Sequence, residues 1–397
     1  MKIGILTYHR SINNGAVIQC YSLAKRLKKE FNYADVEVID YHMPIAEKNY
    51  STSLADYIKS SSIYISFKKM CKLLIDPLFL VRLGKRKKSF AEVLTILPLS
   101  NTKIFENDTK TLFDFINDNY DVVIAGSDAI WNYNMRGFPN PYFLDDSIKS
   151  IKFSYAASCY GMCYENISEY EKNRIREILD SYSYLGVRDD ESEFFVDYLS
   201  CKTPKSHTCD PTVFLDVNDL PIDIKSLEAK MKIKGFDFKK TAIAIMGSSE
   251  MCKMVRKMYG KKYQIVALYN YCKNADVNLY DISPYEWAYV FRYFKLTFTT
   301  YFHGTLLSLR NGTPVICVAL ETDYSKNHTT KVQDFLHRLN MDEFYFHTDY
   351  NSLNIKSIKK KSDYLLNNDI SSDILSKMDK EAKTADLFFE QLRIAIK

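Results

Sequence analysis

Apolar and polar positions along the chain form two successive series of short apolar runs, each followed by a helix-period stretch. The first series opens with an apolar run over 3–8, a polar turn over 13–15 and an amphipathic pattern over 16–31. A second apolar run follows over 36–41. This order predicts a strand, a helix and a second strand of one parallel sheet.

The remaining runs extend both series. In the first series we predict strands at 121–125, 151–155 and 184–188, with a closing element at 210–215. In the second series we predict strands at 241–246, 263–269, 296–300 and 314–320. Helical patterns lie among the second set at 251–258, 284–294, 304–310 and 331–339. Strands that alternate with helices indicate α/β architecture, so the chain is expected to form two Rossmann-like domains.

The length of 397 residues suits two domains of ordinary size. We assign 1–216 to an N-terminal Rossmann-like domain, with a Ser- and Lys-rich helical insertion at about 44–100. The second Rossmann-like domain is assigned to 217–375, and its first part, to about residue 240, is expected to be a polar linker. A C-terminal helix over 376–397 is expected to pack across the domains.

Charge and cysteine content narrow the class of protein. The formal net charge of +5 is dispersed, and its densest run, over 85–88, is typical of a solvated helix face, so no nucleic acid is expected. The nine cysteines lack paired CxxC motifs, which predicts reduced thiols, no metal site and a cytoplasmic protein. The apolar stretch 73–83 is too short to cross a bilayer; it indicates a packed helix pair or a contact with the inner face of the membrane.

The richest candidate chemistry lies in the run 296–320. A predicted strand ends at the turn Tyr301-Phe302-His303-Gly304, and a helical pattern begins at once. The first backbone N–H groups of a helix lack partners and favour an anion such as phosphate or carboxylate. A histidine there suits general acid or base catalysis, although a lone histidine is more often structural.

Polar residues follow three further predicted strands. Ser127 and Asp128 offer hydrogen bonds to an anion or a sugar hydroxyl, and Trp131 offers an apolar face on which a sugar could stack. An N-cap followed by a core aromatic residue explains these residues equally well. Asn14 and Gly15 offer amides to a ligand, or form only a turn.

Arg188 follows the third of these strands directly. Its guanidinium could bind a carboxylate or phosphate in bidentate fashion. A salt bridge to Asp189, Asp190 or Asp210 is the alternative interpretation.

Taken together and in order, these segments resemble the polysaccharide pyruvyl transferase family. The matching segments span most of the chain and read ILTYHRSINNGAVIQCYSL, VVIAGSDAIWN, FSYAASCYG, GVRDDES, CDPTVFLD, ISPYEWAYVFRYFKLTFTTYFHGTLLSLRNGTPVICV and KVQDFLHRLN. The elements G-S-D-x-x-W-N and F-H-G-T are the most specific.

The resemblance implies a fold like that of GT-B glycosyltransferases, with two Rossmann-like domains facing a cleft. It also implies transfer of pyruvate from phosphoenolpyruvate to two hydroxyls of a sugar, as a cyclic ketal, during surface polysaccharide biosynthesis. Phosphoenolpyruvate is then a substrate and no cofactor is expected. The acceptor would be a saccharide, free or linked to a nucleotide, lipid or polymer.

The same resemblance assigns roles to residues. His303 resembles the family's catalytic histidine, and Arg188 one of its phosphoenolpyruvate-binding arginines. The sequence differs from the family pattern at Tyr301, where some branches of the family have an arginine. Lys331, Arg310 or backbone amides are expected to take the place of that arginine. The full expected site comprises His303 and Asp128 for catalysis, Arg188, Gly304, Thr305 and Lys331 for the donor, and Asn14, Gly15, Ser127 and Trp131 for the acceptor.

Two other functions remain open from the sequence. A GT-B glycosyltransferase would use a nucleotide sugar in the same cleft, and a non-catalytic carbohydrate-binding protein would keep the fold without turnover. The missing arginine gives both of them weight. The oligomeric state, the acceptor sugar and the ketal stereochemistry are undetermined.

Overall fold

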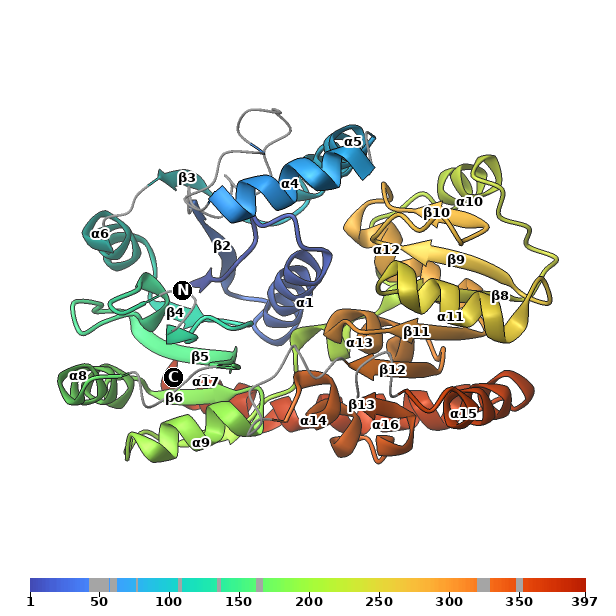
Figure 1. Ribbon diagram of the computed structural model, residues 1–397. Helices are drawn as coiled ribbons and strands as arrows, with labels where there is room; N and C mark the ends of the chain where they lie inside the picture. Colours follow the sequence, from blue (N-terminus) through green and yellow to red (C-terminus); the bar gives the residue numbers. More distant parts are fainter. Residues whose placement is uncertain are drawn as a thin grey trace.

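The computed structural model describes residues 1–42, 57, 63–75, 78–105, 109–133, 137–161, 167–319, 329–347 and 353–397. Two parallel β-sheets with surrounding helices lie side by side, and the start of helix α1 and helix α13 lie between them (Figure 1). The predicted α/β class is therefore confirmed. Part of the predicted insertion, including 43–56, lies outside the described residues.

The first sheet has seven strands in the order β3-β2-β1-β4-β5-β6-β7. Its strands are β1 (Lys2–Leu6), β2 (Asp35–His42), β3 (Leu99–Phe105), β4 (Val122–Ala125), β5 (Ile151–Ala157), β6 (Tyr184–Val187) and β7 (Lys205–His207). Every residue of the central strand β4, VVIA, is buried. Such a run of β-branched residues suits a parallel strand that is covered on both faces.

The second sheet has six strands in the order β10-β9-β8-β11-β12-β13. They are β8 (Ala242–Met246), β9 (Gln264–Leu268), β10 (Val277–Leu279), β11 (Leu296–Thr299), β12 (Val315–Ala319) and β13 (Tyr345–His347). All strand pairs in this sheet are parallel, so their carboxyl ends share one edge.

Helices connect the strands. In the N-terminal half they are α1 (Asn14–Glu30), α4 (Ile63–Ile75), α5 (Phe79–Leu94), α6 (Thr109–Asn119), α8 (Glu169–Asp180) and α9 (Asp190–Tyr198). In the C-terminal half they are α10 (Ile224–Ile233), α11 (Ser249–Tyr259), α12 (Pro284–Val290), α13 (Phe302–Arg310), α14 (Lys331–Arg338), α15 (Ile355–Asn367), α16 (Ser371–Ala382) and α17 (Asp386–Ala395).

Four strands were not predicted from the sequence, and all four lie at sheet edges. These are β3, β7, β10 and β13, and most of their residues are partly or fully exposed except in β10. Short edge strands lack the continuous apolar run that marks a buried parallel strand. Two further expectations need correction: the closing element contains the 3₁₀ helix Pro211–Phe214, and the expected linker contains helix α10.

Apolar contacts join the two halves. Ile12 and Val17 belong to the same buried cluster as Trp287, and helix α1 contacts helix α12. The chain finally returns to the first sheet, where the ring of Phe388 in α17 lies 4.8 Å from that of Tyr155. Because these contacts bury large side chains from both halves, the carboxyl edges of the two sheets are held facing one another.

Candidate functional site

A cavity of about 260 Å³ lies where the two sheets meet. Six of the predicted site residues line it: Asn14, Gly15, Asp128, Arg188, His303 and Lys331. Its wall also contains Asn13, Met246, Tyr269, Trp287, Tyr301 and Phe302. The cavity therefore collects residues from both sheets, as expected of a site in an open α/β protein.

The wall is built from the carboxyl ends of strands. Arg188 follows β6 directly, and Asp128 comes three residues after the end of β4. From the second sheet, Tyr269 follows β9 directly and His303 comes soon after β11. Parallel strands end at one edge, so residues far apart in sequence meet there without further adjustment of the backbone.

Two helices begin at the cavity. Asn13 caps α1 by accepting a hydrogen bond from the backbone N–H of Gly15 at 3.0 Å. Helix α13 begins beside it, and His303 occupies its first turn. The first N–H groups and the positive dipole ends of both helices therefore lie near one another, which favours an anion between them.

Gly15 and His303 are in direct contact. A Cβ atom added to Gly15 would lie only 2.0 Å from Nδ1 of His303. Glycine is thus required here because the imidazole occupies the space of a side chain.

The other side of the imidazole faces a buried carboxylate. Nε2 of His303 lies 3.6 Å from Oδ2 of Asp210, and Nη1 of Arg188 donates a hydrogen bond to the same oxygen at 3.2 Å. Burial by itself would raise the pKa of Asp210, but His303 and Arg188 outweigh it and lower that pKa to about 2. Asp210 is therefore an ionised group that orients two candidate catalytic or binding residues.

Arg188 is the centre of a buried charge cluster. Its side chain is 2% exposed, and beyond Asp210 it lies 3.6 Å from Asp128 and 3.7 Å from Asp189. Burial alone would lower the pKa of Arg188, but Asp128, Asp210 and Asp189 outweigh burial and raise it. The salt-bridge interpretation of Arg188 is thus correct for Asp189 and Asp210, and the guanidinium also borders the cavity.

Asp128 lies between two cations. Its Oδ1 is 3.6 Å from Nη2 of Arg188 and 3.6 Å from Nζ of Lys331. Burial would raise the pKa of Asp128, but Lys331, Arg188 and His303 outweigh it and hold that pKa well below its ordinary value. Both separations exceed hydrogen-bonding distance, so a ligand oxygen can compete with Asp128 for either cation.

The backbone of the cavity wall is unusual at two positions. Asp128 has a φ of 85° and Tyr269 a φ of 70°, although neither is glycine. Positive φ values at such residues persist only where surrounding structure enforces them, and they concentrate at functional sites.

Several polar atoms in this wall are buried without a hydrogen-bond partner among the described residues. They are Oδ1 of Asn14, Nε and Nη2 of Arg188, Nε2 of His303 and Nε1 of Trp287. Buried polar atoms in folded proteins are nearly always hydrogen-bonded, and the carboxylates nearest to the Arg188 and His303 atoms lie at 3.6–3.7 Å, beyond hydrogen-bonding distance. Such a group of atoms around one cavity indicates a polar ligand. Most of these atoms donate hydrogen bonds, which favours an anionic ligand.

Two predicted acceptor residues lie behind the wall. Trp131 is fully buried and its ring lies parallel to that of Phe143 with centroids 6.1 Å apart. Its interpretation as a platform for a sugar is therefore wrong, because the side chain is fully buried and does not line the cavity. Ser127 is 1% exposed and is not part of the cavity wall, so it does not reach the ligand space as predicted.

Two residues that were expected to bind phosphoenolpyruvate, Gly304 and Thr305, pack within the second half of the molecule. Thr305 is buried, and its backbone N–H and hydroxyl both donate to the carbonyl of Tyr301, at 3.0 and 3.2 Å. Thr305 therefore has no backbone or side-chain donor left for phosphoenolpyruvate. A Cβ at Gly304 would lie 2.6 Å from Sδ of Met246, so this glycine permits close packing of α13 and offers no side chain to the cavity.

The two side chains expected as replacements for the missing arginine lie in different places. Arg310 donates to the carbonyl of Leu215 at 2.7 Å and pairs with Asp379 at 2.9 Å, away from the cavity. Lys331, in contrast, borders the cavity together with Arg188. Tyr301 itself lies in the wall and accepts a hydrogen bond from the side-chain amide of Asn270 at 3.1 Å.

Sequence analysis missed Trp287 and Tyr269 as wall residues. Trp287 lies in the middle of a helical pattern and is fully buried, so its sequence context is that of an ordinary core residue. Tyr269 continues an apolar strand. The only available signal for either was its place near a strand end or a helix start.

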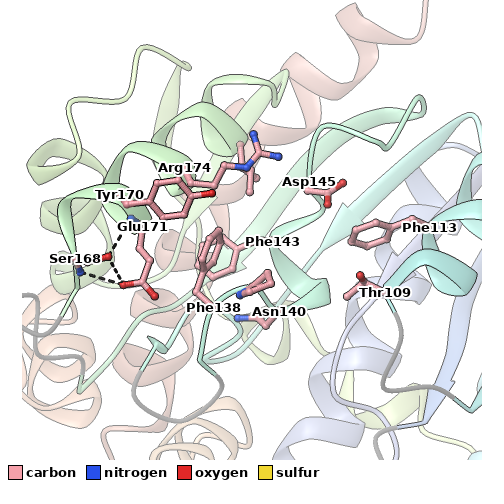
Figure 2. A pocket seen from close by; sticks show the side chains of 12 residues that line it. Thr109, Phe113, Phe138, Asn140, Phe143, Asp145, Ser168, Tyr170, Glu171 and Arg174 are labelled. Atoms are coloured by element: carbon pink, nitrogen blue, oxygen red, sulfur yellow. Dashed lines mark hydrogen bonds between the residues drawn. The ribbon is translucent and has the colours of Figure 1, made fainter.

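A larger cavity of about 500 Å³ lies elsewhere, and Figure 2 shows its aromatic and polar wall. Ser168 and Glu171 there bond each other as the capping box of α8, and Arg174 pairs with Asp146. We assign the chemistry to the smaller cavity because the charged groups of the larger one already satisfy one another.

The described residues contain no group of three or more His, Cys, Asp or Glu side chains arranged to hold a metal ion. No described helix has the length and apolar content needed to span a membrane.

The fold and the interdomain cavity define a GT-B-type architecture. The UDP-GlcNAc 2-epimerase of Neisseria meningitidis, bound to UDP-GlcNAc, superimposes with a TM-score of 0.58 at 10% identity over 99% of each chain. A putative UDP-N-acetylglucosamine 2-epimerase from Listeria monocytogenes gives a TM-score of 0.54 at 11% identity, over 100% of this chain and 96% of the other. Spinosyn forosaminyltransferase gives 0.51 at 9% identity over 100% of both chains. These likenesses establish the fold alone.

The sequence defines the family. The family model described as polysaccharide pyruvyl transferase matches residues 13–322, which is most of the chain. The match includes five of the six predicted residues of the cavity wall, and Lys331 lies beyond it. This protein therefore belongs to the polysaccharide pyruvyl transferase family. No curated protein matches its sequence significantly.

Proposed function

We propose that this protein transfers pyruvate from phosphoenolpyruvate to two hydroxyls of a sugar, forming a cyclic ketal for a surface polysaccharide. The observation that carries the proposal is the convergence of Arg188, His303 and Lys331 on one cavity, where the carboxylates nearest to Nε and Nη2 of Arg188 and to Nε2 of His303 lie at 3.6–3.7 Å, beyond hydrogen-bonding distance. The family membership of the chain fits the same reaction.

The donor is expected to bind between Arg188, Lys331 and the first turn of α13. Phosphoenolpyruvate carries a phosphate and a carboxylate, and these groups require cations and N–H donors. Its anionic groups would displace Asp128 from one or both of its cations, which are each 3.6 Å away. Lys331 takes the place of the arginine that some members have at the position of Tyr301.

His303 is proposed as the acid and base of the reaction. One acceptor hydroxyl adds to C2 of phosphoenolpyruvate while a proton is added to C3, which converts the methylene group to a methyl group. The C–O bond to phosphate then breaks, and the second hydroxyl adds to the same C2. One hydroxyl proton thus ends on the methyl carbon and the other on the released phosphate. Asp210 would hold the imidazole in place during these transfers.

Asp128 is proposed to orient the acceptor. Its carboxylate borders the cavity and can accept hydrogen bonds from sugar hydroxyls. Asn14 has an unpaired Oδ1 in the same wall and is proposed to accept from a hydroxyl as well.

Calorimetric titration with phosphoenolpyruvate tests the donor site directly. Wild-type protein should show saturable binding, and Lys331→Met should weaken it by about tenfold or more, because one charge-assisted contact is lost. His303→Gln should retain donor binding but release no phosphate when acceptor sugars are supplied. Arg310→Met is the matched control, since this cation points away from the cavity.

UDP and UDP-GlcNAc serve as competing ligands in the same titration. Binding of either one, with no response to phosphoenolpyruvate, would favour nucleotide-sugar chemistry in this cavity and overturn the proposal. Undiminished phosphate release by His303→Gln would overturn the role of the histidine.

A further inference from the structure

The helical insertion exposes an apolar stripe on each of its two described helices. On α4, Phe67, Met70 and Leu74 are 58%, 44% and 76% exposed. At the start of α5, Leu78 and Val81 are 60% and 55% exposed. Spacings of three and four residues place each set on one face of its helix. Large apolar side chains at this density are uncommon on a surface that faces only water.

These two helices are also strongly basic. The sequence of α4 contains three lysines, and that of α5 contains five Lys or Arg residues, against a single acidic residue, Glu92. Val81 lies beside Lys85 on the helix, and Lys85, Lys87 and Lys88 are all at least partly exposed. Apolar side chains flanked by cations are the composition of helices that lie in the interface of an anionic membrane.

We propose that α4 and α5 form a docking surface for a membrane that contains anionic lipids, and that the acceptor sugar is presented there on a lipid carrier. The charge of the two helices complements an anionic surface, and the apolar stripes have no other cover among the described residues. Figure 1 shows both helices at the top of the view, with α4 above β2 and α1 and with α5 toward the second half. The part that concerns the acceptor rests on the proposed function.

The inner side of α5 connects this surface to the reaction cavity. A third cavity, of about 320 Å³, lies beneath α5 and is lined by Arg82 and Arg86 together with Ser248 and Tyr269. Tyr269 also lines the reaction cavity, so the two spaces are neighbours. The guanidinium of Arg86 lies 3.5 Å from the ring centroid of Tyr269. A phosphorylated lipid carrier would thus find cations between the membrane and the reacting sugar.

Vesicle sedimentation tests the surface without donor or acceptor. The probes are vesicles of phosphatidylcholine alone and vesicles of phosphatidylcholine mixed with phosphatidylglycerol. Wild-type protein should bind the anionic vesicles and lose this binding at high salt. Leu74→Ser/Leu78→Ser and, separately, Lys85→Ser/Lys88→Ser should each weaken binding by about tenfold or more. Ile233→Ser is the matched control, because this side chain on α10 is 87% exposed and lies outside the stripe.

Equal vesicle binding by wild-type protein and both double variants would overturn the proposal, as would failure of the wild type to bind anionic vesicles. Light scattering provides the remaining check. A wild-type dimer that Leu74→Ser/Leu78→Ser converts to a monomer would overturn it too, and would make this surface an interface between two copies of the chain. Phosphoenolpyruvate titration of the same variants should be unchanged, so failure of the docking surface and failure of the donor site are read separately.

Discussion

The imidazole of His303 lies against the backbone of Gly15, in the space that a side chain at position 15 would occupy. A Cβ atom at that position would lie 2.0 Å from Nδ1 of the histidine. Gly15 belongs to the first turn of α1 and His303 to the first turn of α13, so this contact joins helix starts from both halves of the molecule. The placement of the candidate catalytic residue therefore depends on a glycine in the other half.

Gly15→Ala tests this dependence. The added methyl group must displace the imidazole, so we expect turnover to fall by about a hundredfold, while alanine in a helix preserves the fold. Steady-state rates of phosphate release measure the effect. In the double variant Gly15→Ala/His303→Ala the losses should not add, because the methyl group acts only through the histidine. Additive losses would show that the alanine disturbs another part of the site.

Arg188 and Lys331 should differ in their effect on folding. Arg188→Ala leaves Asp128, Asp189 and Asp210 without their shared cation, and we expect a loss of about 3–5 kcal/mol in the free energy of unfolding. Lys331→Met removes a cation at the cavity rim and should cost much less. Urea denaturation measures both. A small effect of Arg188→Ala would mean that the carboxylates are solvated or protonated, contrary to the buried charge cluster around this arginine.

The free energy of unfolding should depend on pH through the ionisation of Asp210. Its pKa is about 2 in the folded protein, below the ordinary 3.8, so its ionised form contributes about 2 kcal/mol above pH 4. That contribution should disappear as the pH falls from about 4 to about 2, since protonation then becomes favourable in both states. Chemical denaturation of wild type and Asp210→Asn at several pH values measures it. A difference between the two proteins that stays constant across this range would contradict the assignment.

The two tryptophans provide a reporter for ligand binding. Trp131 is a core residue and Trp287 borders the cavity, and the chain contains no other tryptophan. Trp131→Phe should therefore retain donor binding, and phosphoenolpyruvate should still change the fluorescence of the protein through Trp287. Trp287→Phe should abolish that change. A fluorescence response that follows Trp131 instead would restore its role in the site.

Structural features that depend on neighbouring residues in the sequence could be predicted, and features that depend on contacts between distant segments could not. The run 122–125 forms a strand because Val and Ile favour a pleated, buried surface, and a polar residue after such a run lies at the carboxyl edge of the sheet. Asp128, Arg188 and His303 were found in this way. The edge strands were missed because their burial depends on a neighbour on one side only.

Burial of single residues could not be predicted from local pattern. Trp131 and Trp287 each follow a turn or a helix start, yet the first is packed on Phe143 and the second lines the cavity. Thr305 and Lys331 were both expected at the phosphoenolpyruvate site, but only Lys331 lines the cavity. Thr305 is turned toward the second sheet, where its hydroxyl lies 3.2 Å from Sγ of Cys317 in β12.

The sequence by itself thus determined the two α/β series, their order and the polar residues at their strand ends, because these depend on local propensity and periodicity. Only the tertiary structure decided that the carboxyl edges of the two sheets face each other. It also decided that the imidazole of His303 packs against Gly15 and that Asp128 lies between Arg188 and Lys331. Those relations depend on the apolar contact of α1 with α12, between residues that are distant in sequence. No local pattern encodes such a contact, since its free energy comes from surfaces that exist only after both halves have folded.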